Sequence, residues 1–236
     1  IKNMTLKIAE IGINHMGNER YFLEYLRLLP KKIDGVTLQI PKKESLSKSN
    51  IKCYLNDDKI IKYIRLLKKK FNLVGIATNN YEKIDMFSKL NIDFIKILSG
   101  SATDIKFINK ILKTKVKKVY LSLGFNSYKD TKKVLKKIDK KKISLIHTSF
   151  DKRLSEINLK KITILKEMFG LPVAYGNHSE YLDCIPNSVF LEPCAIFFYV
   201  KLNKNLNYPD KSHAVNIKNI NLLLDKIREN TIMLKK

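Results

Sequence analysis

Short apolar runs alternate along the chain with longer amphipathic segments. The apolar runs are rich in β-branched residues, as is typical of parallel strands that are buried on both faces. They predict eight strands at residues 6–13, 35–40, 72–78, 94–98, 118–123, 143–149, 172–177 and 194–200. The amphipathic segments between them predict helices at 19–29, 57–70, 81–90, 104–113, 128–137, 158–169, 181–190 and 217–234, of which 181–190 is the weakest because it contains Pro186.

Strict alternation of strand and helix favours an α/β fold in which the strands close into a (β/α)8 TIM barrel. A chain of 236 residues is the size of one such barrel, so we expect a single domain over 1–236. An open, doubly wound sheet is the structural alternative. The longest connection, 41–56, follows the second strand and is expected at the carboxyl-terminal rim, where barrels of this kind build their sites.

Composition narrows the classes of protein that the chain can belong to. It has no apolar run long enough for a bilayer and no secretory signal pattern, so we expect a cytoplasmic protein with no membrane partner. The three cysteines, Cys53, Cys184 and Cys194, are odd in number and widely spaced, which argues against a disulfide framework or a zinc site. The net charge of +24 is spread over nearly every predicted helix, so we expect no nucleic-acid partner, although a basic nucleic-acid binder stays a rival hypothesis.

Polar groups interrupt strands that should be apolar. Glu10, Gln39, Lys96, Ser122 and His147 lie within or at the ends of predicted strands, where an unpaired polar group would be costly. They must pair with one another or bind something. One alternative is an interior ion pair between Glu10 and Lys96, and the other is a ligand site at the strand ends.

Small and hydroxyl residues close two of these strands. Ser99-Gly100 follows the fourth strand, and Ser122 and Gly124 lie at the end of the fifth. Hydroxyls, backbone N–H groups and a neighbouring cation, here Lys96, suit phosphate or carboxylate oxygens. His15 and His178 lie at predicted strand ends on the same rim, so a metal site is possible, although spacing alone does not show that they converge.

Several motifs resemble those of one enzyme family. In chain order they are IAEIGINHMGN at 8–18, VTLQ at 36–39, GIATNNYEKIDMFSKLNIDFIKILSGS at 75–101, VYLSLGFNS at 119–127, SLIHTS at 144–149, FGLPVAYGNHS at 169–179 and YPDKSHA at 208–214. They are similar to segments of the sialic acid synthases and of their pseudaminic and legionaminic acid relatives.

The resemblance implies an enzyme that joins phosphoenolpyruvate to an N-acetylated amino sugar aldehyde, giving a nonulosonic acid and phosphate. It implies a divalent metal, Mn or Mg, that polarises the aldehyde. It assigns catalytic roles to Glu10 and His15 and a metal ligand to His178. It assigns substrate-binding roles to Asn14, Gln39, Thr78, Lys96, Ser99, Ser122 and Asp210.

The chain also departs from the pattern of that family. The second metal histidine aligns with Tyr199 and the preceding glutamate with Phe197, while other expected ligands align with Thr37, Ser101, Phe150, Lys152, Gly176 and Asn177. We expect a barrel without the family's C-terminal antifreeze-like domain, and a possible homodimer formed through barrel helices. Two hypotheses follow: an altered synthase in which Lys42, Lys201 or His213 replaces missing ligands, or a catalytically degenerate relative that acts in binding or assembly.

Overall fold

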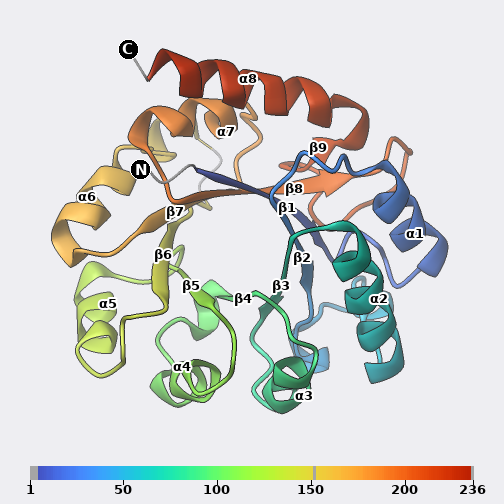
Figure 1. The fold of residues 1–236 in the computed structure, drawn as a ribbon, viewed down its shortest axis with the longest axis horizontal. Helices are drawn as coiled ribbons and strands as arrows, with labels where there is room; N and C mark the ends of the chain where they lie inside the picture. Colours follow the sequence, from blue (N-terminus) through green and yellow to red (C-terminus); the bar gives the residue numbers. More distant parts are fainter. Residues whose placement is uncertain (1–4, 151–152, 235–236) are drawn as a thin grey trace.

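A closed barrel of parallel strands forms the centre of the protein (Figure 1). The computed structural model describes residues 5–150 and 153–234. Its strands are β1 (Leu6–Gly12), β2 (Gly35–Gln39), β3 (Leu73–Thr78), β4 (Phe94–Ile97), β5 (Lys118–Ser122), β6 (Ile143–His147), β7 (Val173–Asn177), β8 (Ala195–Lys201) and the short β9 (Val215–Asn216). Each strand from β1 to β8 pairs in parallel with the next, and β8 pairs with β1, which closes the barrel. The predicted TIM barrel is confirmed, and the open sheet is excluded.

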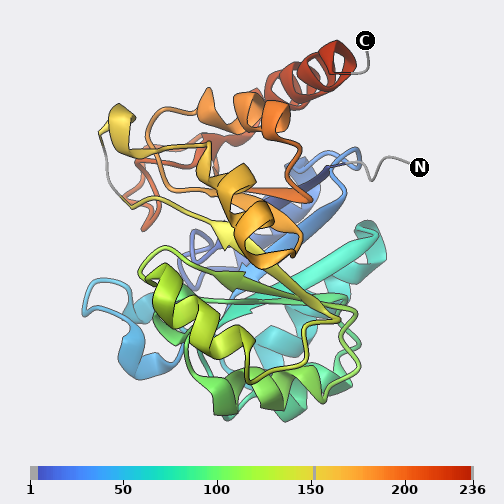
Figure 2. The ribbon, with the colours of Figure 1, turned by 90° about the vertical axis from the view of Figure 1, so that its left-hand side faces the viewer.

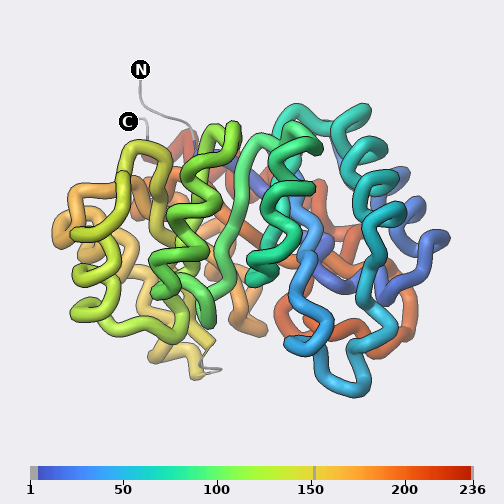
Figure 3. The backbone as a smooth tube through the Cα atoms, turned by 90° about the horizontal axis from the view of Figure 1, so that it is seen from below, coloured from blue at the N-terminus to red at the C-terminus, as the bar shows by residue number. Residues whose placement is uncertain are grey.

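Helices cover the outside of the barrel. They are α1 (Glu19–Leu28), α2 (Asp57–Lys70), α3 (Ile84–Lys89), α4 (Ile105–Leu112), α5 (Tyr128–Leu135), α6 (Lys161–Phe169), α7 (Cys184–Asn187) and α8 (Ile220–Met233). Short 3-10 turns lie at Lys43–Ser45, Ile51–Cys53, Ser99–Ser101, Leu154–Glu156, Ser188–Leu191 and Ile217–Asn219. Seen from below, α2, α3, α4 and α5 follow one another around the outside (Figure 3). Among the described residues, no helix is both long and apolar enough to cross a membrane.

Local sequence explains where several helices begin and end. The side chain of Asn18 accepts hydrogen bonds from two backbone N–H groups of α1, and Asp104 and Ser127 cap α4 and α5 in the same way. Helix α6 ends at Gly170, whose φ of 62° is left-handed. Helix α7 is a single short turn, as Pro186 within the weak predicted helix 181–190 suggests.

The barrel interior has an apolar lower layer and a polar upper layer. Phe94, Tyr120 and Phe197 pack edge to face with ring centroids 4.9 to 6.1 Å apart and fill the lower layer. Gly75 makes room for the ring of Phe94, since a Cβ there would lie 2.2 Å from it. Above this layer, at the carboxyl ends of the strands, lie the polar residues that the sequence singled out.

The loops that follow the strands gather at one end of the barrel. Figure 2 shows the segment 41–56, in light blue, projecting on the side opposite to the N-terminus. The same side carries the red segment around 202–214. The predicted placement of the longest connection at the carboxyl-terminal rim is confirmed.

Candidate functional site

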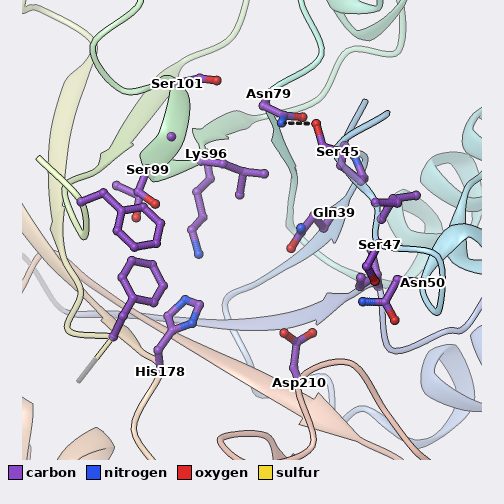
Figure 4. A pocket seen from close by; sticks show the side chains of 18 of the residues that line it. Gln39, Ser45, Ser47, Asn50, Asn79, Lys96, Ser99, Ser101, His178 and Asp210 are labelled. Carbon is purple, nitrogen blue, oxygen red and sulfur yellow. Dashed lines mark hydrogen bonds between the residues drawn. The ribbon is translucent and has the colours of Figure 1, made fainter. Parts of the chain in front are cut away.

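A pocket of about 520 Å³ opens at the carboxyl-terminal end of the barrel (Figure 4). Six residues predicted from the sequence line it: Gln39, Lys96, Ser99, Ser122, His178 and Asp210. Further lining comes from the β2 loop (Pro41, Ser45, Leu46, Ser47 and Asn50), from Ile13, Asn79, Leu98, Gly100 and Ser101, and from the rings of Phe125, Phe150 and Tyr199. The strand ends therefore bring cationic, hydroxyl, acidic and aromatic groups to one cavity.

Lys96 lies at the base of this pocket and is paired with Glu10. Its Nζ lies 2.7 Å from each carboxylate oxygen of Glu10, and both side chains are buried. Thr37 donates a further hydrogen bond of 3.2 Å to the same carboxylate. The ammonium group also lies over the rings of Phe197 and Tyr199, 5.2 and 5.6 Å from their centroids. The interior ion pair weighed from the sequence is present, and its cation still faces the pocket.

Hydroxyl groups surround the pocket side of Lys96. Ser99, Gly100 and Ser101 form a 3-10 turn directly after β4, and Ser122 ends β5. Asn126 fixes this turn, because its amide donates a 2.9 Å hydrogen bond to the backbone carbonyl of Ser99. A cation with several hydroxyls beside it is suited to an anionic group such as phosphate or carboxylate.

Asp210 enters the pocket on the loop between β8 and β9. Asn14 anchors this loop: its side chain accepts a 3.1 Å hydrogen bond from the backbone N–H of Asp210 and donates one of 2.9 Å to the carbonyl of Val200. Burial and the neighbouring Glu10 raise the pKa of Asp210 to about 7, and the nearby Lys96 opposes this shift. Oδ2 of Asp210 is buried and has no hydrogen-bond partner among the described residues. A buried carboxyl of this kind can hold a proton near neutral pH and donate it to a ligand oxygen.

Tyr199, His178 and His213 form a compact aromatic cluster beside Asp210. The three ring centroids lie 4.8 to 5.1 Å apart. Complete burial raises the pKa of the Tyr199 phenol well above its usual value, so the phenol stays protonated. Burial, Lys96 and His213 lower the pKa of His178, so its imidazole is neutral. Nε2 of His213 lies 3.6 Å from Oδ1 of Asp210.

Gly12 determines how closely this cluster packs on the barrel. Its φ of 57° is left-handed, and the β1–β2 register shifts between Glu10 and Gly12. A Cβ at Gly12 would lie 2.8 Å from the Tyr199 ring and 3.1 Å from Oδ2 of Asp210. Only glycine suits both this backbone and this contact.

One wall of the pocket is made of stacked phenyl rings. Phe125 and Phe150 lie with centroids 4.3 Å apart and planes 14° apart, and the rings of Phe150 and His178 lie edge to face with centroids 4.8 Å apart. Gly124 leaves space for Phe150, since a Cβ there would lie 2.0 Å from the ring. Phe125 is 72% exposed. Neither ring was singled out as a ligand-binding group from the sequence, because an apolar residue in a loop carries no periodic signal.

The opposite wall is made of amides and hydroxyls. Figure 4 shows Ser45, Ser47, Asn50 and Gln39 across the cavity from Ser99 and His178. Asn79 fixes the start of the β2 loop, because it accepts a 2.9 Å hydrogen bond from the backbone N–H of Lys42 and donates one of 2.9 Å to Ser45. The sequence placed this loop at the rim but did not identify these side chains individually.

Other residues predicted to act at the site lie outside the pocket lining. His15 is fully buried: Nδ1 accepts a 3.0 Å hydrogen bond from the backbone N–H of Gly17, and the ring meets Tyr63 of α2 edge to face. Thr78 donates its hydroxyl to the carbonyl of Ile40 at 2.7 Å. Glu10 and Asn14 support the pocket from behind it. Of the suggested replacement ligands, Lys201 donates to the carbonyl of Lys211 at 2.6 Å.

Two further sequence features have local structural explanations. His147 lies 2.9 Å from the carbonyl oxygen of Ile157 and so ties the end of β6 to the following segment. At Gly176 a Cβ would lie 2.7 Å from the Thr148 hydroxyl, which explains the absence of a larger side chain there. Lys152 lies outside the described residues.

The fold and pocket define a TIM barrel with a cavity at its carboxyl-terminal end, lined by cationic, hydroxyl, acidic and aromatic side chains. The pattern of the NeuB family matches residues 31–236, and the chain therefore belongs to the NeuB family. A relative, the N,N'-diacetyllegionaminic acid synthase of Campylobacter jejuni subsp. jejuni serotype O:2, is 26% identical over 254 residues, covering 95% of this chain and 76% of the relative. The pseudaminic acid synthase of serotype O:23/36 of the same organism is 25% identical, covering 94% and 72%.

Solved structures share the fold. The N-acetylneuraminic acid synthetase of Leptospira borgpetersenii serovar Hardjo-bovis, in complex with citrate, superposes with a TM-score of 0.90 at 19% identity, covering 100% of this chain and 86% of that one. A truncated 3-deoxy-D-arabino-heptulosonate 7-phosphate synthase from Thermotoga maritima gives a TM-score of 0.73 at 13% identity, covering 98% and 88%. The resemblance found in the sequence motifs is confirmed at the level of family and fold.

Proposed function

We propose that this protein is a transferase that condenses phosphoenolpyruvate with an N-acetylated amino sugar aldehyde, forming a nonulosonic acid and releasing phosphate. The observation that carries the proposal is Lys96, a buried cation that opens onto a pocket together with Ser99, Ser101 and Ser122. Relatives named as legionaminic and pseudaminic acid synthases support the same class of reaction.

In this proposal Lys96 and the hydroxyls hold the anionic groups of phosphoenolpyruvate. The pairing with Glu10 holds the Lys96 ammonium group at the base of the pocket, because both carboxylate oxygens accept hydrogen bonds from it. Ser99 and Ser122 then receive phosphate or carboxylate oxygens. In this proposal Glu10 acts through Lys96: replacing Glu10 would change the position of the ammonium group that binds the substrate.

The second substrate lies between Asp210 and the β2 loop in this proposal. Gln39, Ser47 and Asn50 offer amide and hydroxyl groups to sugar hydroxyls. Asp210, whose pKa is raised to about 7, hydrogen-bonds the sugar and can supply a proton to an oxygen that gains negative charge. Asn14 positions Asp210 through the backbone of its loop.

The side chains around His178 do not fit the divalent metal that the sequence resemblance implies. The described residues contain no group of three His, Cys, Asp or Glu side chains that could hold an ion. The rings of Phe150, Tyr199 and His213 surround His178, and the phenol of Tyr199 is a poor ligand while protonated. No step of the proposed reaction is therefore derived through a metal.

The degenerate binding protein remains the second candidate, and the same misfit favours it. A barrel that has lost its metal ligands can keep the Glu10–Lys96 pair for stability alone, because a buried pair cannot lose one partner cheaply.

Phosphate release separates the two candidates. The protein is incubated with phosphoenolpyruvate and a panel of N-acetylated amino sugar aldehydes, with and without Mn²⁺, and inorganic phosphate is measured. The proposal expects phosphate release that depends on one of the aldehydes and is lost in Lys96→Met. Binding of phosphoenolpyruvate in calorimetry without phosphate release from any aldehyde would instead favour the binding protein.

A further inference from the structure

The pocket has two chemically different walls. Amides and hydroxyls from the β2 loop form one, and the stacked rings of Phe125 and Phe150 form the other. Only the first wall can form hydrogen bonds with the hydroxyl groups of a sugar. The second wall offers no hydrogen bond and so gains free energy only from apolar surface.

The aromatic wall is a built part of the site. Phe150 lies between Phe125 and His178, in ring contact with both, and its position depends on the missing side chain at Gly124. The stack therefore continues from the partly buried His178 to the exposed Phe125. It runs along the pocket from its base toward solvent.

Two adjacent, partly exposed phenyl rings form an apolar patch that a ligand in the pocket can cover. Phe125 is 72% exposed and Phe150 is 37% exposed, although both line the pocket. A substrate whose reacting end lies near Lys96 would extend its far end along this wall. A hydroxyl placed there would lose its hydrogen bonds to water, whereas a methyl group would gain apolar contact.

The geometry points to Phe125 and Phe150 as a specificity subsite for a methyl-bearing substituent, carried by the aldehyde substrate on the carbons far from its reacting end. This inference rests on the proposed function for the identity of the substrate. The methyl group can belong to a deoxy carbon or to an acylamino group. A terminal hydroxymethyl or a free amine in the same place is disfavoured.

Matched sugar pairs test the inference. One pair differs only in a terminal methyl or hydroxymethyl group, and the other only in an acylated or free distal amine. With phosphoenolpyruvate present, kcat/KM from phosphate release is expected to favour the methyl-bearing member of at least one pair by tenfold or more, within the range of about 10- to 200-fold that one small apolar group gives. Phe150→Ala should reduce that preference to less than about threefold, chiefly through KM for the sugar, with the affinity for phosphoenolpyruvate retained.

The variants and a binding assay keep the outcomes distinct. Gly124→Ala should act like Phe150→Ala, since it displaces the ring, while Phe190→Ala removes a 44% exposed ring that does not line the pocket and should keep the preference.

If no aldehyde releases phosphate, the proposed reaction fails, and the unreactive sugar alcohols of both pairs are then titrated by calorimetry. Equal affinities within both pairs, or a preference that survives in a folded Phe150→Ala protein, would overturn the inference.

Discussion

Lys96 binds both carboxylate oxygens of Glu10 at 2.7 Å, and both side chains lie inside the barrel at the base of the pocket. One pair of residues therefore serves two purposes. It neutralises two buried charges, and it holds a cation where an anionic substrate would arrive.

Replacing one partner of this pair should be worse than replacing both. Lys96→Met leaves the Glu10 carboxylate unpaired, at a cost of about 3 to 5 kcal/mol in the free energy of unfolding. The double variant Glu10→Gln, Lys96→Met buries no charge and should be more stable than Lys96→Met alone. Urea denaturation measures both. Lys117→Met, at an 82% exposed lysine, is the control and should change stability by less than about 1 kcal/mol. A double variant less stable than Lys96→Met would contradict the coupling.

Alanine variants at three glycines distinguish the loss of stability caused by a left-handed backbone from the loss caused by a steric collision. Gly170→Ala places a Cβ on a left-handed backbone with nothing within 4 Å, and should cost about 1 kcal/mol. Gly12→Ala adds the collision with Tyr199 and Asp210 and should cost clearly more, about 2 to 4 kcal/mol. Gly100 has neither a left-handed backbone nor a neighbour within 4 Å of the added Cβ, so the stability of Gly100→Ala should differ from that of the parent by less than about 0.5 kcal/mol. Thermal denaturation of the three variants orders them, and equal losses for Gly12→Ala and Gly170→Ala would show that the Tyr199 contact is not tight.

His15 should make the protein less stable as the pH falls. Burial, with a smaller effect of Lys59, lowers the pKa of His15 to about 4, while an unfolded histidine titrates near 6.5. Between these values only the unfolded chain binds the proton, so stability is lost as the pH falls from about 6.5 to 4, by about 3 kcal/mol at most. His15→Asn can still accept from Gly17 and should reduce this slope. Urea denaturation of the parent and the variant at several pH values tests this. An unchanged slope would mean that His15 binds protons equally in the folded and unfolded chains.

Asp210 should have the opposite pH dependence. Its pKa is raised to about 7 in the folded protein, above the ordinary value of 3.8 for an aspartate, so the folded chain holds the proton more tightly. Its contribution to stability is present below about pH 4 and is lost as the pH rises through 7. Asp210→Asn should therefore gain stability relative to the parent between pH 4 and 7. A difference that does not vary with pH would show that Asp210 is ionised throughout this range.

Tyr199→His tests the divalent metal site that the sequence resemblance implies. A histidine there would lie beside His178 and His213, whose ring centroids are about 5 Å from that of Tyr199. We expect weak Mn²⁺ binding by the parent and at least tenfold tighter binding by the variant, because imidazole is a far better ligand than a protonated phenol. Calorimetry measures the affinity, and Tyr199→Phe is the matched control. Equal affinity of the parent and Tyr199→His would show that the surrounding side chains, and not residue 199 alone, prevent metal binding.

The sequence predicted the barrel because buried parallel strands and amphipathic helices have different periods. The strands in the structure end one or two residues inside several of the predicted limits; β1, for example, ends at Gly12. The charged residues within buried strands also predicted a specific contact, the Glu10–Lys96 ion pair. Glu10 and Lys96 are 86 residues apart in the chain, yet a shared barrel interior leaves them few other partners.

Side chains beyond the strand ends were harder to place. Asn14 and His15 follow the register shift at Gly12 and lie beside the left-handed Met16 and Gly17, so the strand period does not determine where their side chains point. Asn14 therefore anchors the Asp210 loop, and His15 packs on Tyr63. The Phe125–Phe150 stack depends on the contact between two loops, which no local pattern in the sequence encodes.

The pairing of β1 with β8 also affects how the protein is made. Glu10 leaves the ribosome well before Tyr199, its partner across the β1–β8 pairing, and before Asp210, which lines the pocket. Contacts of such high sequence separation form late and slowly. The segment that carries Glu10 must therefore remain without the final surroundings of its carboxylate until β8 has been made. Chaperone dependence during translation should accordingly be greatest before β8 has emerged.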